Sequence, residues 1–198
     1  ARKIIRNELD IGKKPVLGMV GRYDPQKNHK GLIEALGVVK KEGYNFDLIL
    51  VGRDLNRDNK ILLKAIREHD LFEEVHLLDQ RNDIPSVMNA LDIHVLSSSY
   101  GEGFPNVIAE AMACGTPCIA TDIGDSKIIV NEYGSIVEPN NTKELSSAIM
   151  SNLDLMKNET VWNNLVLSSR RHITENFSIE NMVASYRNVW EGKHHHDS

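Results

Sequence analysis

Short apolar runs alternate with amphipathic segments from the start of the chain to about residue 137. The apolar runs have the length of strands and lie at residues 15–21, 46–51, 75–78, 93–96, 117–121 and 135–137. Continuous apolar runs are typical of parallel strands, because such strands are buried on both faces. Between the runs, apolar residues at helical spacing predict helices at 31–41, 59–69 and 84–91, with shorter helical segments at 1–14 and 126–131. In the helix at 31–41, Leu32, Leu36 and Val39 are expected to face inward, and Gly43 marks the end of the helix.

The order of these elements predicts the fold class. Strands that alternate with helices form a parallel sheet with right-handed crossovers. We therefore expect an α/β fold with a Rossmann-like, doubly wound sheet, whose ligands bind at the carboxyl ends of the strands. From Thr142 onward the pattern is helical only, with helices expected at 143–155, at 161–176 and after Ser178, whose hydroxyl is suited to capping. No linker or repeat interrupts residues 1–191, so one domain with extra C-terminal helices is expected.

The stretch 97–118 carries the most specific chemistry. A strand ends at Leu96, a loop of small residues follows, and a helix begins beside Pro105, whose fixed φ suits a first helical turn. The free amides at that helix start carry partial positive charge and are suited to a phosphate or another anion. The helix is apolar nearly all round but carries Glu110, which we expect to be buried and to need polar partners. Glu102 lies eight positions earlier, so two carboxylates flank one anion-binding turn.

The run Glu-Gly-Phe-Pro-Asn-Val-Ile-Ala-Glu-Ala-Met-Ala-Cys-Gly-Thr-Pro, residues 102–117, resembles a known family signature. It is similar to the donor site of family 4 retaining glycosyltransferases, the E-x7-E enzymes of the GT-B fold, also called glycosyltransferases group 1. The resemblance covers nearly the whole chain, residues 1–191, and implies that this is the C-terminal, donor-binding domain. Such an enzyme moves a hexose-type sugar from a nucleoside diphosphate to a saccharide or lipid-linked acceptor with retention. The resemblance implies a missing N-terminal acceptor domain. In its general features the sequence is similar to bacterial transferases of polysaccharide or lipopolysaccharide assembly.

The resemblance also implies roles for particular residues. Gly21-Arg22-Tyr-Asp-Pro-Gln-Lys27 fits the family pattern whose Arg and Lys contact the diphosphate. By resemblance, Glu110 binds the ribose hydroxyls and Glu102 lies near the donor sugar. The family also places the amides of Gly103, Phe104, Asn106 and Val107 near the sugar and phosphate, and the loop of Arg81 and Asn82 near the nucleobase.

Two fixed cations and a helix start can stabilise a departing diphosphate without a metal, so no metal or cofactor is expected. The catalytic candidates are the two cations, Arg22 and Lys27, and, by resemblance, Glu102. Plainer structural roles stay open beside these. The charged turn at 22–27 could be solvated surface, Glu102 could complement a helix dipole, and Glu110 could bond to backbone amides.

Other polar residues receive simpler interpretations. We expect His29 to be a surface histidine, and His76 and His94 to be core or hydrogen-bonded residues within strands. Ser98 and Ser99 either line the cleft or cap the loop. Cys114 and Cys118 have neither metal-ligand spacing nor a disulfide framework and are expected to be small buried residues.

Composition narrows the function classes further. A net charge of −5 and a pI near 5.9 argue against nucleic acid as a partner. No signal peptide and no transmembrane segment are recognisable, so the sequence predicts a cytoplasmic protein and leaves open peripheral attachment of the full-length enzyme to a membrane. His194, His195 and His196 lie in a tail at 192–198, which is either tag-derived or native.

Competing enzyme classes fail on spacing. The sequence lacks the dinucleotide-binding pattern G-x-G-x-x-G, the phosphate-binding pattern G-x-x-x-x-G-K-[ST] and the hydrolase elbow G-x-S-x-G. A glycoside hydrolase would use the paired glutamates but would leave Arg22 and Lys27 unexplained. A non-catalytic nucleotide-sugar-binding module and a GT-B epimerase stay open as alternatives. No motif in the sequence identifies the donor nucleotide (uridine, guanosine or adenosine diphosphate), the sugar or the acceptor.

Overall fold

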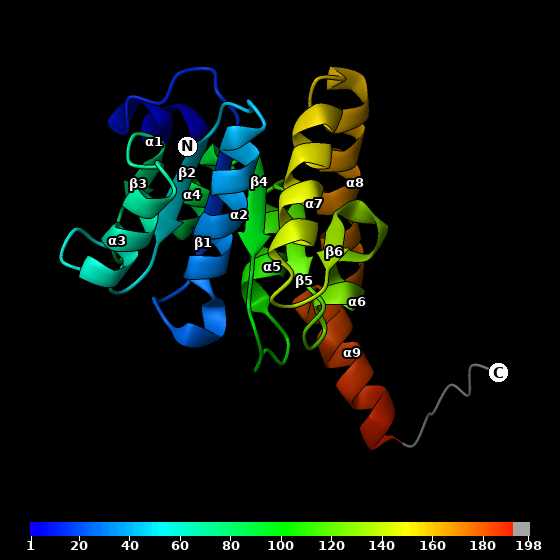
Figure 1. The fold of residues 1–198 in the computed structure, drawn as a ribbon. Coiled ribbons are helices and arrows are strands. Elements are labelled where there is room, and N and C mark those ends of the chain that lie inside the picture. Colours follow the sequence, from blue (N-terminus) through cyan, green and yellow to red (C-terminus); the bar gives the residue numbers. More distant parts are fainter. Residues whose placement is uncertain (192–198) are drawn as a thin grey trace.

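A six-stranded parallel sheet forms the centre of the molecule (Figure 1). The structure is a computed structural model and describes residues 1–191; the tail at 192–198, with its three histidines, lies outside the described residues. The strand order is β3-β2-β1-β4-β5-β6, and every pairing is parallel. The strands are β1 Val16–Val20, β2 Asp47–Val51, β3 Val75–Leu77, β4 Ile93–Leu96, β5 Cys118–Thr121 and β6 Ser135–Val137. The α/β fold with a Rossmann-like, doubly wound sheet is therefore confirmed.

The winding of the chain reverses between β1 and β4, which are adjacent in the sheet but far apart in the sequence. Leu17 pairs with Ile93 and Gly18 with His94. In open sheets of this kind, a crevice forms at such a switch point, outside the carboxyl ends of the two strands. The loops after β1 and β4 meet there, along the lower edge of the sheet in Figure 1.

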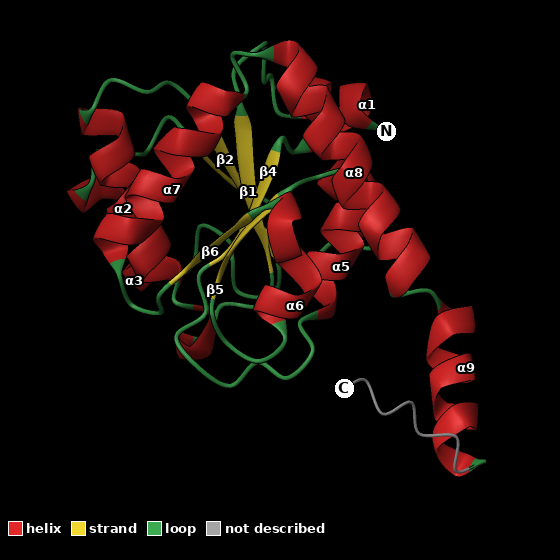
Figure 2. Cartoon of the chain, turned by 90° about the vertical axis from the view of Figure 1, so that its right-hand side faces the viewer, coloured by secondary structure: helices red, strands yellow, loops and turns green. Residues whose placement is uncertain are grey.

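Helices cover both faces of the sheet (Figure 2). Contacts group α2, α3 and α7 on one face, and α1, α4, α5, α6 and α8 on the other. The helices are α1 Arg2–Glu8, α2 His29–Lys41, α3 Lys60–Glu68, α4 Ile84–Ala90, α5 Asn106–Ala113, α6 Ser126–Val130, α7 Thr142–Leu155, α8 Glu159–Asn176 and α9 Ile179–Trp190, with short 3-10 turns at Pro25–Lys27 and Asn131–Tyr133. None of the helices within residues 1–191 is both long and apolar enough to cross a membrane.

Burial follows the apolar pattern of the sequence. The strands β2, β4 and β5 are buried along their whole length, as expected of central parallel strands. On α2, the inward residues Leu32, Leu36 and Val39 are fully buried, as predicted. At the N-terminal end of the chain, α1 is held against the sheet by Asp92. The Asp92 carboxylate forms ion pairs with Arg2 and with Arg6, the latter at 2.7 Å, and accepts a hydrogen bond from the amide of Val16 at 2.7 Å.

Helix α2 begins two residues earlier than the apolar spacing suggests, and this corrects the expectation for His29. Asn28 adopts a left-handed conformation and its side chain accepts a hydrogen bond from the amide of Gly31 at 3.1 Å, so the helix starts at His29. The His29 ring is 2% exposed and lies against the Tyr23 ring, with 5.4 Å between centroids. The prediction of a surface histidine was wrong, because the turn that precedes α2 folds the ring inward.

The other histidines and the cysteines match their predictions more closely. His94 is fully buried and accepts a hydrogen bond from the amide of Val20 at 3.3 Å, and His76 contacts Asp47 at 3.0 Å. Cys118 is buried, whereas Cys114, at the end of α5, is only partly buried. Both thiols are free, and burial raises the pKa of each.

The last helix stands apart from the rest. α9 extends beyond the body of the domain in both ribbon views (Figures 1 and 2). Ser178 caps it as predicted, accepting a hydrogen bond from the amide of Asn181 at 3.2 Å. No residue of α9 is buried. Its exposed apolar residues are Ile179, Met182, Val183, Tyr186, Val189 and Trp190.

Candidate functional site

The turn after β1 and the loop after β4 are tied together through their backbones. The amide of Ser99 donates to the carbonyl of Gln26 at 2.7 Å, and the Gln26 side chain donates to the carbonyl of Gly101 at 2.9 Å. The buried hydroxyl of Ser97 donates to the carbonyl of Lys27 at 3.0 Å. Two segments separated by about seventy residues of sequence therefore form one edge of the crevice.

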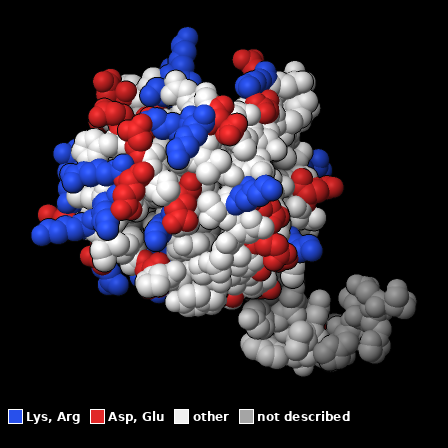
Figure 3. Space-filling model, in the orientation of Figure 1, with Lys and Arg blue, Asp and Glu red and all other residues white. Residues whose placement is uncertain are grey.

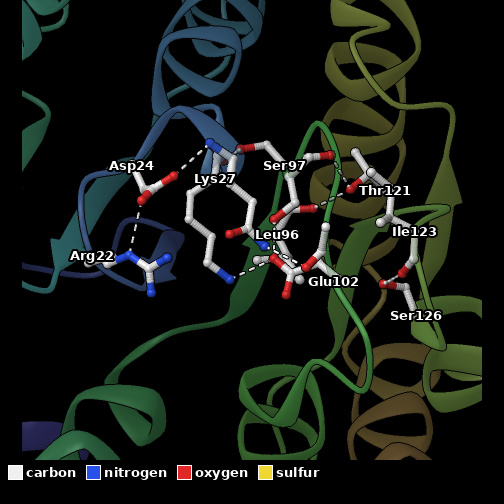
Figure 4. A network of polar contacts seen from close by, with 12 residues as sticks. Arg22, Asp24, Lys27, Leu96, Ser97, Glu102, Thr121, Ile123 and Ser126 are labelled. Carbon is white, nitrogen blue, oxygen red and sulfur yellow. Dashed lines mark hydrogen bonds and ion pairs between the residues drawn. The ribbon is translucent and has the colours of Figure 1, made fainter.

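Lys27 and Glu102 meet across this edge. Lys27 Nζ lies 2.6 Å from Glu102 Oε1, and their side chains are 14% and 9% exposed. The hydroxyl of Ser98 donates to the same oxygen at 2.6 Å. Figure 4 shows Lys27 and Glu102 turned toward one another, from the turn after β1 and the loop after β4. A cation and an acid that the sequence places far apart are thus direct partners.

Arg22 lies beside this pair and is held by a different carboxylate. Its Nε lies 3.0 Å from Asp24 Oδ2, as Figure 4 shows. Asp24 also caps the turn Pro25–Lys27 by accepting a hydrogen bond from the amide of Gln26 at 2.9 Å. Two hydrogen bonds lower the pKa of Asp24: the one from the Gln26 amide has the larger effect, and the one from Arg22 has the next largest. The Arg22 side chain is half exposed, so its guanidinium is accessible to a ligand.

Two glycines that belong to none of the sequence motifs allow the backbone of this edge to pack closely against the neighbouring loops. A Cβ on Gly124 would lie 2.2 Å from the carbonyl oxygen of Gly103 and 2.4 Å from that of Glu102. A Cβ on Gly52 would lie 2.1 Å from the carbonyl oxygen of Gly21. Each glycine directly follows a strand or the short turn after it, and that position at the carboxyl end of the sheet was the available signal. Only residues without a side chain allow these backbones to approach so closely.

The start of α5 forms the second wall. Among the described residues no side chain caps this helix, which begins at Asn106 after Pro105. Just before it, the amide of Asp125 donates to the carbonyl of Gly103 at 2.9 Å. Glu110 does not behave as expected: it is exposed rather than buried, because α5 turns its other face, with Ile108 and Met112, into the core. Within residues 1–191 the side chain of Glu110 has no hydrogen-bonded partner, so the carboxylate is available to a ligand.

These residues surround a crevice made of two adjoining cavities. The first has a volume of about 440 Å³ and is lined by both walls. Its lining includes Gly21, Arg22, Lys27, Glu102, Phe104, Asn106, Val107 and Glu110. The second, of about 400 Å³, shares Val20, Gly21, Arg22 and Ile84 with it and extends to Gly52, Arg53, Gln80 and Arg81. Two basic side chains, Arg22 and Lys27, and two acidic ones, Glu102 and Glu110, therefore converge on one crevice.

Three of the predicted site residues occupy less direct positions. Arg81 lines the second cavity, but its guanidinium binds Asp83 at 2.8 Å and Glu8 at 2.6 Å, and the hydrogen bonds to these carboxylates raise its pKa. Asn82 is exposed and lines neither cavity, and Gly103 contributes its backbone beside the first cavity without lining it. The loop serines have separate partners, since Ser98 contacts Glu102 and Ser99 donates to Asn140 at 2.6 Å.

On the face shown in Figure 3, basic and acidic side chains of the described residues are interspersed rather than gathered by sign. This differs from the basic stripe with which proteins bind a nucleic-acid backbone. Among residues 1–191, no three His, Cys, Asp or Glu side chains are grouped so that they could hold a metal ion.

Several known proteins resemble this chain in sequence. A galactosyltransferase of Escherichia coli, named as acting from UDP-Gal on α-D-GlcNAc-diphosphoundecaprenol, is 31% identical over 88% of this chain and 45% of its own length. An uncharacterized glycosyltransferase of Methanocaldococcus jannaschii is 31% identical over 96% of this chain and 51% of its own. The chain thus spans about half the length of these relatives.

Solved structures share the fold. HepE of Anabaena, crystallised with UDP and glucose, superposes with a TM-score of 0.82 at 26% identity, over 96% of this chain and 51% of its own. A glycosyltransferase of Rickettsia africae superposes with a TM-score of 0.84 at 23% identity, over 96% of this chain and 51% of its own. The profile of the family described as "Glycosyl transferases group 1" matches residues 1–176. This chain therefore belongs to the glycosyl transferases group 1 family.

Proposed function

We propose that this chain binds a nucleoside-diphosphate sugar in the crevice and, together with a second domain, transfers the hexosyl group to a saccharide or lipid-linked acceptor with retention of configuration. The observation that carries the proposal is the convergence of Lys27 and Glu102, 2.6 Å apart, on a cavity that also contains Arg22, Glu110 and the start of α5. Retention rests on the resemblance of the Glu102–Glu110 run to the E-x7-E signature.

The residues have complementary roles in this proposal. Arg22, Lys27 and the uncapped start of α5 bind the diphosphate. When the bond between the anomeric carbon and the diphosphate oxygen breaks, the bonding electrons leave with the nucleoside diphosphate. These donors stabilise the negative charge that develops there, so the reaction needs no metal. The acceptor oxygen forms the new bond to the anomeric carbon, and its proton passes to the departing diphosphate. Glu102 contacts hydroxyl groups of the donor sugar, and Glu110 accepts hydrogen bonds from the ribose.

The second cavity is the proposed position of the base, with backbone groups of the loop around Arg81 at its border. Uridine diphosphate sugars are the first donors to test, because the Escherichia coli relative is named for UDP-Gal and the Anabaena structure contains UDP. Guanosine and adenosine diphosphate sugars complete the panel.

Two other functions use the same crevice. A non-catalytic module would bind the sugar nucleotide with the same residues but would have no turnover in any context. A GT-B epimerase would convert the sugar nucleotide without an acceptor. Product analysis with and without an acceptor separates both from transfer.

Replacing Lys27 by alanine is expected to weaken binding of nucleoside diphosphates by about ten- to a hundredfold, since a hydrogen bond to a charged group contributes roughly 1.5–3 kcal/mol. Glu110→Ala is expected to weaken binding by about tenfold through loss of the ribose contact. Isothermal titration calorimetry with UDP, GDP and ADP measures both. Lys30→Ala is the matched control, because Lys30 lies nearby on α2, is 71% exposed and forms its ion pair with Glu34. If neither Lys27→Ala nor Glu110→Ala weakens the tightest binder, the site assignment is wrong.

We further propose that the exposed apolar stripe of α9 packs against the N-terminal domain of a full-length enzyme. Its residues recur at the spacing of one helix face, and Trp190 is 83% exposed. Half of each relative's length lies outside the region matched by this chain, which is enough for such a domain.

The chain alone is accordingly expected to bind nucleotide weakly and to transfer no sugar, because the acceptor site is on the other domain. A radiolabelled transfer assay with UDP-galactose and UDP-glucose, with a longer protein that includes the N-terminal domain as the positive control, checks this. Sugar transfer by residues 1–198 alone would contradict it.

A further inference from the structure

Glu102 is held by a hydroxyl group that the catalytic assignment does not use. Ser98 is fully buried, and its Oγ donates to Glu102 Oε1 at 2.6 Å. The Ser98 backbone is fixed in turn, because the Thr121 hydroxyl donates to its carbonyl at 2.8 Å. Thr121 is the last residue of β5 and is itself buried. A chain of two hydrogen bonds thus connects the sheet to the carboxylate (Figure 4 shows its Thr121 and Glu102 ends).

The two oxygens of Glu102 have different surroundings. Oε1 accepts both Lys27 Nζ and Ser98 Oγ. Oε2 has no hydrogen bond to residues 1–191, and it is not among the buried polar atoms that lack a partner. It is therefore accessible and able to accept a hydrogen bond from a ligand, while Oε1 is occupied by the protein.

From this arrangement we infer that Ser98 is a positioning residue, which orients the Glu102 carboxylate so that Oε2 faces the donor sugar. The inference rests on the proposed function. Lys27 cannot perform this task alone, because a bound diphosphate competes for its ammonium group. Ser98 bears no charge and is shielded from solvent, so it keeps its bond to Oε1 when the diphosphate is bound.

Ser98→Ala should therefore affect recognition of the sugar and leave recognition of the diphosphate unchanged. We expect about tenfold weaker binding of UDP-galactose and less than a twofold change for UDP, with the matching GDP or ADP pair used if the panel shows tighter binding. In saturation-transfer NMR on the bound sugar nucleotide, the signal of the hexosyl protons should fall relative to that of the base protons. A general loss of stability would lower both signals equally.

Ser99→Ala is the matched control, since Ser99 is the next residue of the same loop and its hydroxyl binds Asn140. It should leave both affinities unchanged. In a Glu102→Gln background, Ser98→Ala should add less than a twofold further loss, because the hydroxyl acts through the carboxylate.

Each outcome decides between distinct claims. Equal losses for UDP and UDP-galactose in Ser98→Ala, or no loss for either, would overturn the positioning role while the proposed function stands. A wild-type chain that binds no nucleoside diphosphate and no sugar nucleotide would overturn the proposed function, and with it this inference.

Discussion

Replacement of Gly124 by alanine is expected to lower both the stability of the domain and its affinity for a sugar nucleotide. The new Cβ would lie 2.2 Å from the carbonyl oxygen of Gly103 and 2.4 Å from that of Glu102, so the loop that carries Glu102 must move. Overpacking of this kind costs about 1–3 kcal/mol, and the left-handed backbone at Gly124, with φ of +58°, adds roughly 1 kcal/mol for a residue with a Cβ. We expect the free energy of unfolding to fall by about 2–4 kcal/mol and sugar-nucleotide affinity to fall at least about tenfold.

Gly43→Ala separates the two causes. Gly43 also has a left-handed backbone, with φ of +88°, but a Cβ added there would meet no heavy atom of residues 1–191 within 4 Å beyond its chain neighbours. This variant should lose only about 1 kcal/mol of stability and no affinity. Urea denaturation and calorimetry measure both quantities. Equal losses in the two variants would show that Gly124 is needed for its backbone conformation and not for the close approach to Glu102.

Lowering the pH from 6.5 to 4 is expected to destabilise the protein strongly through two buried histidines. Burial, and then the charge of Lys27, lower the pKa of His29 to about 4 and that of His94 to about 3. In the unfolded chain both titrate near pH 6.5. Between these values the unfolded state binds protons that the folded state does not, so the free energy of unfolding falls as the pH falls. The loss over this range is roughly 3 kcal/mol for each histidine, at about 1.4 kcal/mol per pH unit.

Denaturation curves at pH 7, 6, 5 and 4 measure this slope, and His29→Leu tests its origin. Neither ring nitrogen of His29 has a hydrogen-bond partner among residues 1–191, so leucine should preserve the stability at pH 7 and reduce the slope by about half. Carboxylates with a lowered pKa, such as Asp24 and Asp83, lose their contribution to stability as the pH falls from about 5 through their ordinary value of 3.8, and this loss is the same in the wild type and in His29→Leu. An unchanged slope in His29→Leu would contradict the assignment.

The folding pattern was largely predictable from sequence. The strands at 93–96 and 135–137 have the predicted ends, and other element ends differ by one or two residues in most cases. Continuous apolar runs and helical spacing depend on local sequence and on burial by the sheet, and both are recorded in the chain itself. The early start of α2 was missed because a left-handed Asn28 cap has no unique sequence signal.

The sequence predicted which residues form the site, but it did not predict how they contact one another. The Glu102–Glu110 run and the Arg22–Lys27 turn could be named because each is a contiguous motif. Their direct contact could not, because it depends on the switch point between β1 and β4, which brings distant loops together. The exposure of Glu110, the engagement of Arg81 by Glu8 and the burial of His29 each depend on which neighbour packs alongside.

By itself, then, the sequence determined the order of strands and helices, the strand ends at which ligands bind, and the motif residues that make this chain recognisable. Only the tertiary structure decided that Lys27 and Ser98 both donate to the same oxygen of Glu102. It also decided that Gly52 and Gly124 lie directly against the backbone of the loops that carry the site. The physical reason is that periodicity is a property of neighbouring residues. Hydrogen bonds between loops and contacts under a missing Cβ exist only once the sheet has placed those loops side by side.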